Sequence, residues 1–416
     1  METTTIINEK KFTAYQVVAV ILLAMTQFTV VLDFMVMSPL GDMLMKSMSL
    51  TTSQFGFAVS AYAFSAGFSG LLTAGFADRF DRKKLLLFFY IGFIIGTLAC
   101  GLASNYFMLI SARIITGLFG GVIGSISMAI VADLFPLNQR GRAMGFLQMG
   151  FGASQVLGIP ISLYIANHWG WQSPFLMIVG LGTIIWLVVM FKMQPIVQHL
   201  GLKTEKTAIK HLWHTFSRRE YRMGFLLTAM MSLGGFMMMP WGSAFAVNNL
   251  KVSYSQLPVL FMASGIVALI IMPLVGKLSD KVDKAKIFTV AALWMMVFVV
   301  IYSNLTPIPF LLVLVMNIVM MIGIMSRIVP GMALVSALPK MQDRGAFMSI
   351  NSSLQQIAGG VAAGIGGMIV VQKSKTSPLE HYDILGYVIA VILIANILQV
   401  YRVSNWLKVQ KHKEKL

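Results

Sequence analysis

Charged residues are scarce in this sequence, and acidic residues are scarcer than basic ones. Only 11% of the 416 residues are charged, with 15 Asp and Glu against 32 Lys and Arg. Soluble domains carry about 25% charged residues, so a soluble globular fold is excluded. The single cysteine, Cys100, rules out a disulfide framework within the chain.

Signs of enzyme chemistry are also missing. The six histidines show no metal-ligand spacing. Neither a glycine-rich phosphate-binding loop nor a catalytic triad can be read from the sequence. The sequence therefore predicts no enzyme activity, no metal site and no bound cofactor.

Hydrophobic residues, by contrast, make up 57% of the chain. Runs of about 20 apolar residues, long enough to cross a bilayer, recur along its whole length. The predicted spans are 14–38, 52–73, 84–103, 106–134, 142–166, 171–192, 222–248, 255–275, 286–303, 308–336, 345–371 and 383–405. Strands of an outer-membrane barrel would alternate apolar and polar residues. These runs do not alternate, so we predict an all-α membrane protein of twelve transmembrane helices.

The net charge of +17 could suggest a nucleic-acid partner, but its distribution indicates membrane topology instead. Sorted by predicted loop, 26 of the basic residues fall on one face of the membrane and four on the other, while two lie within spans. Basic loops stay in the cytoplasm. We therefore expect a multi-pass protein of a bacterial inner membrane, with both termini cytoplasmic, in contact with the lipid bilayer and not with nucleic acid.

Two charged motifs occur twice, about half a chain apart. Asp78, with basic residues after it, matches Asp280, 202 residues later. Arg140, after the fourth span, matches Arg344, 204 residues later. A parallel repeat of six-helix bundles explains both offsets. The predicted domains are an N-terminal bundle over 1–192, a cytoplasmic linker over 193–221 and a C-terminal bundle over 222–416.

The loop after the second span resembles the signature of the major facilitator superfamily, in which a glycine is followed four residues later by an acid and then by basic residues. The first copy supplies the acid and basic residues as Asp78, Arg79, Arg82 and Lys83. It has Ala74 and Asp81 where the signature has glycines. The second copy keeps Gly276 but has Asp283 at the later position. The resemblance covers essentially the whole chain and implies the two-bundle fold of this superfamily.

Within the superfamily, the first half is similar to twelve-span bacterial drug:proton antiporters and arabinose-efflux-type permeases. In span four, Arg113 precedes a run of glycines, and span five contains Gly152, Gly158 and Pro160 as expected hinge or packing positions. The family usually has glycine directly before the proline, whereas Ile159 stands there in this chain. The resemblance implies a monomeric transporter driven by a proton gradient.

The superfamily resemblance also implies a role for the cytoplasmic loop. Asp78 would face the N-terminus of a helix in the other half, where the helix dipole favours a carboxylate, and Arg82 would pair with Asp133 at the inner end of span four. The motif would then be a latch that holds the outward-open state. The residues assigned to this gating motif are Asp78, Arg79, Arg82, Lys83, Asp133, Gly276 and Asp280. The alternative is a solvated loop whose charges only enforce topology.

Asp33 is the acidic residue that lies clearly inside a predicted span. It precedes Pro39 by six residues, which places it about 9 Å from the outer end of span one at a rise of 1.5 Å per residue. Arg113 lies about 10 Å from the outer end of span four by the same measure. We therefore predict that Asp33 and Arg113 pair and carry proton coupling. A static buried ion pair that fixes helix packing is the alternative.

Arg327 is the second cation inside a span, about 18 Å from the inner end of span ten. It could contact an anionic group of the substrate, or carbonyls and water. Uncharged polar residues within the predicted spans are further candidates for a substrate cavity, although buried amides also hold helices together. The full set of cavity candidates is Gln27, Tyr62, Gln148, Gln155, Trp241, Asn248, Gln256, Asn317, Arg327, Asn351 and Gln355.

These features predict a secondary active transporter of small molecules. The favoured function is proton-coupled efflux of small amphipathic or polar organic compounds by alternating access. Two alternatives stay open at this point. One is a facilitator of lipids or lysolipids, which the 32 Met and 28 Phe would suit, and the other is an exporter of sugars or metabolites.

Overall fold

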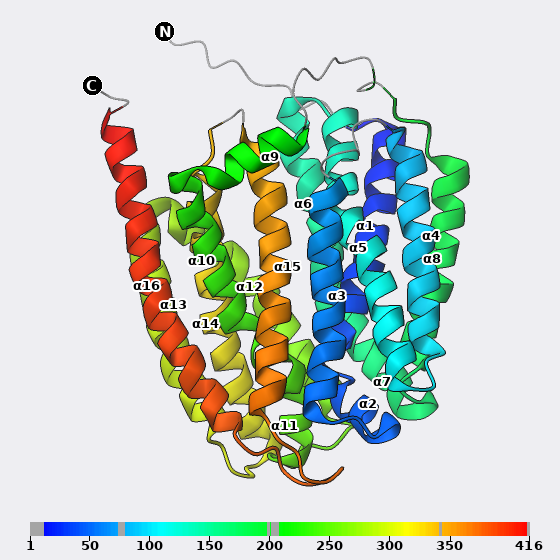
Figure 1. The fold of residues 1–416 in the computed structure, drawn as a ribbon, viewed down its shortest axis with the longest axis vertical. Coiled ribbons are helices and arrows are strands. Elements are labelled where there is room, and N and C mark those ends of the chain that lie inside the picture. Colours follow the sequence, from blue (N-terminus) through cyan, green and yellow to red (C-terminus); the bar gives the residue numbers. More distant parts are fainter. Residues whose placement is uncertain (1–11, 74–79, 198–199, 201–207, 341–342, 414–416) are drawn as a thin grey trace.

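The computed structural model describes residues 12–73, 80–197, 200, 208–340 and 343–413, and within these residues the chain is an all-helical bundle (Figure 1). The first half contains α1 (Ala14–Val36), α2 (Gly41–Met48), α3 (Thr52–Thr73), α4 (Arg82–Gly101), α5 (Tyr106–Leu134), α6 (Leu137–Ala153), α7 (Ile159–Trp169) and α8 (Ser173–Lys192). After α9 (Ala208–Ser217), the second half contains α10 (Arg219–Phe236), α11 (Gly242–Asn248), α12 (Leu257–Lys281), α13 (Lys284–Ser303), α14 (Phe310–Ser336), α15 (Arg344–Ile369) and α16 (Tyr382–Lys413).

Within the described part of the chain, 11 helical segments are long and apolar enough to cross a membrane. The remaining predicted span corresponds to α15, which has 26 residues but no stretch as apolar as those of the eleven. The twelve-helix fold predicted from hydropathy is confirmed. The division into domains at 193–221 stays a prediction.

Two predicted spans are not continuous α-helices. A π-helical turn, Ser154–Gly158, separates α6 from α7, and a 3-10 turn, Met239–Trp241, separates α10 from α11. Pro240 lies within the 3-10 turn, and Pro160 lies two residues after the π-helical turn. Proline lacks the N–H that a regular helix needs. In the first turn, the Ser154 hydroxyl donates hydrogen bonds to the carbonyls of Phe28 and Gly150 at 2.8 Å each.

The internal repeat is visible at the starts of α4 and α13. Asp81 caps α4 by accepting a hydrogen bond from the Lys83 N–H at 2.9 Å, and Asp283 caps α13 by accepting one from the Ala285 N–H at 2.8 Å. The two aspartates have nearly the same backbone angles, φ −54° and ψ 121° against φ −56° and ψ 123°. Both aspartates, which stand where the family signature has a glycine, therefore serve as helix caps.

The two ends of the bundle differ. Figure 1 shows α1 beginning and α16 ending at the same end, where α9 also lies, while α2 and α11 lie at the opposite end. We name these the inner and outer ends, after the predicted topology. Between the halves, α3 packs most extensively against α15. At Gly67 a Cβ atom would lie 2.9 Å from the Ser353 carbonyl oxygen, so glycine permits this close approach.

Candidate functional site

Asp33 and Arg113 form an ion pair between α1 and α5. Arg113 Nη1 lies 2.8 Å from Asp33 Oδ2, and both side chains are fully buried. The hydroxyl of Thr97, on α4, donates to Asp33 Oδ1 at 3.2 Å. The structure thus brings together the two residues that the depth argument matched, and it adds Thr97, which the sequence did not indicate. Their part in proton coupling is not decided by this geometry.

Aromatic rings connect this pair to the second half. The guanidinium of Arg113 lies over the ring of Tyr62 on α3, 4.5 Å from its centroid. The Tyr62 and Phe34 ring centroids are 5.3 Å apart, and those of Phe34 and Phe236 are 5.8 Å apart. Because Phe236 ends α10, side-chain contacts run from the buried ion pair across the interface of the two halves.

Corresponding positions of the second half hold a neutral pair. Asn317 lies 204 residues after Arg113, and Ser264 lies 202 residues after Tyr62. The Ser264 hydroxyl donates a hydrogen bond to the side-chain oxygen of Asn317. The repeat therefore keeps a polar contact at this place in both halves, but only the first half has a charge there.

The described part of the cytoplasmic motif is engaged mainly within the first half. Arg82 Nε lies 3.3 Å from Asp133 Oδ2, and Lys83 Nζ donates to the Met190 carbonyl at 2.8 Å, near the end of α8. In the second copy, Asp280 is exposed, and a Cβ at Gly276 would meet nothing within 4 Å. Asp78 and Arg79 lie outside the described residues. The latch therefore stays a prediction.

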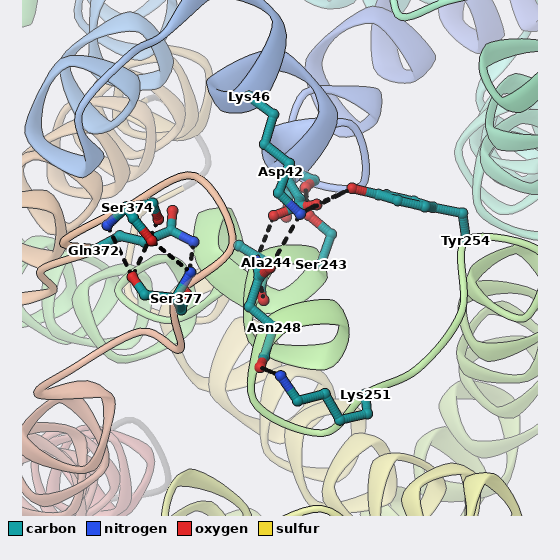
Figure 2. A network of polar contacts seen from close by, with 11 residues as sticks. Asp42, Lys46, Ser243, Ala244, Asn248, Lys251, Tyr254, Gln372, Ser374 and Ser377 are labelled. Carbon is teal, nitrogen blue, oxygen red and sulfur yellow. Dashed lines mark hydrogen bonds and ion pairs between the residues drawn. The ribbon is translucent and has the colours of Figure 1, made fainter.

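At the outer end, a polar cluster joins the halves, and the sequence reasoning missed it (Figure 2). Asp42, on α2, is 1% exposed and lies 2.8 Å from Lys46 Nζ, one helical turn away. From the second half, the Asn248 amide and the Tyr254 hydroxyl both donate to the Asp42 carboxylate. Burial and the neighbouring Asp42 raise the pKa of Tyr254, so the hydroxyl keeps its proton. The Asp42–Lys46 spacing of four residues was the available signal.

Further hydrogen bonds close the same end. The Thr52 hydroxyl donates to the Val370 carbonyl at 2.6 Å, and the Ser243 hydroxyl donates to the Ser38 carbonyl at 2.7 Å. Trp241 is fully buried, with its ring 5.5 Å from that of Phe55. The structure is therefore closed at the outer end.

Two of the predicted cavity residues, Asn248 and Trp241, lie in this closure. The Asn248 side-chain amide donates hydrogen bonds to the Asp42 carboxylate and to the Ala244 carbonyl. Trp241, in the second half, packs against Phe55 of the first half. Both contribute to the outer closure, and a role for them in a substrate cavity stays a prediction. Hydropathy and spacing could not reveal this, because the partners of Asn248 lie about 200 residues away in sequence.

The other uncharged candidates are scattered. Asn351 accepts a hydrogen bond from the Thr228 hydroxyl at 2.7 Å, which ties α15 to α10. Gln148 and Gln355 are exposed. Gln155 is half-buried in the π-helical turn. Gln27 is half-buried, and its side-chain oxygen has no hydrogen-bond partner among the residues that the structure describes. Gln256 stands directly before α12, and its side-chain oxygen accepts a hydrogen bond from the Ser253 N–H in the preceding loop at 3.0 Å.

The span-five positions surround the π-helical turn. A Cβ at Gly158 would lie 2.6 Å from Leu32 Cδ1, and one at Gly152 would lie 2.8 Å from Leu269 Cδ2. Pro160 stands in the first turn of α7. Gly158 thus packs on α1 and Gly152 on α12. A hinge function for these positions stays a prediction.

The side chain of Arg327, on α14, is buried and makes few polar contacts with the described residues. It is 1% exposed, and its Nη2 donates to the Met231 carbonyl of α10 at 3.3 Å. Its Nε and Nη1 have no hydrogen-bond partner in the described part of the chain. Within the same residues, no group of three or more His, Cys, Asp or Glu side chains is arranged to hold a metal ion.

Comparison with known proteins identifies the family of this chain. The model of the Major Facilitator Superfamily matches residues 23–363 and 225–415. The uncharacterized MFS-type transporter YbcL of Bacillus subtilis is 26% identical over 381 residues, which cover 89% of this chain and 93% of that protein. A probable sugar efflux transporter of Helicobacter pylori is 28% identical over 203 residues, which cover 49% of this chain and 50% of that protein.

Solved structures agree on the fold. A bacterial homologue of the human lysosomal transporter Spinster, in an inward-facing and unoccupied conformation, has a TM-score of 0.78 at 16% identity and covers 95% of this chain and 98% of its own. A D-xylose–proton symporter has a TM-score of 0.77 at 17% identity, over 94% and 97% of the two chains. The chain thus belongs to the major facilitator superfamily and is a multi-pass membrane transporter, not an enzyme.

Proposed function

We propose that this protein is a monomeric proton-coupled exporter of small amphipathic or polar organic compounds in a bacterial inner membrane, with both termini in the cytoplasm. The observation that carries the proposal is the Asp33–Arg113 pair, because both charges are fully buried within spans. Ionisable groups at such depth are costly and mark ion pathways in transporters. The proton gradient supplies the energy.

Asp33 is the proton carrier in this mechanism, and Arg113 is its counter-ion. While Arg113 lies 2.8 Å away, the carboxylate is stabilised in its charged form. When the halves rock and Arg113 withdraws, the carboxylate is left in an apolar interior, where the protonated form is favoured. Asp33 thus alternates between a protonated state and a paired state as access alternates.

The contact between Phe34 and Phe236 would couple the change of state at Asp33 to the second half. Phe34 follows Asp33 directly and meets α10 across the interface. A displacement of α10 during substrate binding therefore moves side chains next to the ion pair. At the inner end, Arg82 and Asp133 serve in the proposed latch together with Asp78, which holds the halves in the outward-open state.

Replacement of Asp33 by Asn tests the proposal. In proteoliposomes with an imposed pH gradient, we expect Asp33→Asn to abolish gradient-driven accumulation of a transported compound. Exchange of that compound between the two sides without a gradient should persist, because it needs no proton. Asp283→Asn, a change at the N-cap of α13, is the matched control and should keep both activities. Full gradient-driven accumulation by Asp33→Asn would refute the proposal.

A sugar exporter is the second candidate, favoured by the similarity to a probable sugar efflux transporter of Helicobacter pylori. The same proteoliposomes separate the candidates when sugars, lysolipids and amphipathic organic ions are offered one class at a time. Accumulation of sugars alone would favour the sugar exporter, and movement of lysolipids without a gradient would favour a lipid facilitator.

A further inference from the structure

We infer that the transported molecule is an organic anion and that Arg327 binds its negatively charged group. The inference rests on the proposed transport function and names the substrate class. It comes from Arg327 itself, which is 1% exposed and whose guanidinium makes, among the described residues, one hydrogen bond, to the Met231 carbonyl.

The charge of Arg327 has no counter-charge within the part of the chain that the structure describes. Among the described residues, no acidic side chain forms an ion pair with it, and its Nε and Nη1 have no acceptor. Arg113, by contrast, is paired with Asp33 at 2.8 Å. A buried charge without a partner costs several kcal/mol. An anion supplied by the ligand would remove that cost at Arg327.

Two glycines of α10, Gly234 and Gly235, lie beside the guanidinium. Outside its chain neighbours and its own helix backbone, a Cβ built on Gly235 would have Arg327 Nη2 at 3.7 Å and no other atom of the described residues within 4 Å. Gly235 is itself partly exposed, although Arg327 is not. The space beside Gly235 therefore gives a small group access to the guanidinium from the surface of α10.

This part of α10 lies at the interface of the two halves. Phe236, the residue after Gly235, touches Phe34 of α1 with ring centroids 5.8 Å apart. An anion that entered beside Gly235 would thus lie next to the contact that leads to Asp33. Guanidinium groups bind carboxylates and other oxyanions through paired N–H donors, and Arg327 offers free donors of this kind.

The test uses the purified full-length protein in detergent, where binding is read as a shift of the thermal unfolding midpoint and needs no gradient. The probes are benzoate and phenyl phosphate as anions, with benzamide and benzylamine as neutral and cationic analogues. We expect the anions to raise the midpoint of the wild type and the other two probes to leave it unchanged. A shift by only one anion identifies the headgroup as carboxylate or phosphate.

Two variants locate the site. Arg327→Met removes the charge and keeps an apolar side chain of similar length, so we expect an unliganded midpoint at least as high as that of the wild type and no response to anions. Gly235→Val fills the space between α10 and the Arg327 guanidinium. It should weaken anion binding at least tenfold while Arg327 is kept. Gly180→Val is the matched control, because it makes the same substitution on α8, where a Cβ would meet nothing within 4 Å.

Some results would overturn the inference. They are no anion response in the wild type, an unchanged response in Arg327→Met, or a lower unliganded midpoint in Arg327→Met, which would make the arginine structural. The readout is independent of proton coupling. A wild type that binds anions but fails to use a pH gradient would refute the proposed function and leave the anion site standing.

Discussion

Replacement of Asp42 by Asn at the outer end should shift the protein toward its outward-open state. The Asp42 carboxylate accepts hydrogen bonds from Lys46 in its own helix and from Asn248 and Tyr254 in the second half. Only the last two bonds hold the halves together. Asn has nearly the same shape as Asp but lacks the charge, so these two bonds are weakened while the packing is kept.

The size of the shift follows from those two bonds. A hydrogen bond to a charged group contributes about 1.5–3 kcal/mol, so the pair contributes on the order of 3–6 kcal/mol to closure. An Asn side chain keeps one acceptor, and we expect about half of this, roughly 1.5–3 kcal/mol, to be lost. Since about 1.4 kcal/mol is a factor of ten, the ratio of outward-open to outward-closed protein should rise about 10- to 150-fold.

Distances between spin labels measure that ratio. Ser104 and Thr306 lie in exposed loops at the outer ends of the two halves, 202 residues apart in the repeat. With Cys100, a buried residue, replaced by Ala, cysteines at these two positions carry the labels. Asp42→Asn should increase the population with the longer label distance. Asp283→Asn, at the opposite end of the bundle, should leave it unchanged. A distance distribution that Asp42→Asn does not alter would show that the cluster does not hold the outer end closed.

Two further predictions concern packing and pH. Gly67→Ala places a methyl group 2.9 Å from the Ser353 carbonyl oxygen, so we expect a loss of about 1–3 kcal/mol, seen as a lower unfolding midpoint that Gly180→Ala does not show. The hydrogen bond from Lys408 lowers the pKa of Asp283. The pair therefore stabilises the folded protein fully at pH values above the ordinary aspartate pKa of about 3.9. This stabilisation is lost as the pH falls through the lower pKa of Asp283 in the folded protein. Because both side chains are partly exposed, Lys408→Met should cost less than about 1 kcal/mol near neutral pH, and unfolding midpoints measured against pH should converge with those of the wild type in acid. A difference that persists in acid would exclude this ion pair as its source.

The sequence allowed the spans and one contact to be predicted because both depend on fixed helix geometry. Predicted spans such as 106–134 agree with the helices, since a membrane-spanning helix needs a set length of apolar residues. Asp33 and Arg113 could be matched in depth because each helix rises 1.5 Å per residue and both spans start from the same outer end.

The rest depended on partners that are distant in sequence. Asp42 and Asn248 meet only after the two halves assemble, so the outer cluster was not predicted. Asp81 could have been read as a helix cap, because an aspartate before an apolar run is a helix-start signal. The cavity amides could be assigned to helices by spacing, but spacing does not show whether Asn351 faces a ligand or the hydroxyl of Thr228.

The neutral Ser264–Asn317 contact, which occupies the positions of Tyr62 and Arg113 in the second half, has a consequence for the driving force. In the proposed mechanism, the charged pair is present in one half only, so one proton would enter per cycle through Asp33. Exchange of one entering proton for one departing monoanion moves two positive charges inward. Each charge gains about 2.3 kcal/mol per 100 mV of membrane potential. The voltage across the membrane would then contribute about 4.6 kcal/mol per 100 mV to export, in addition to the pH difference.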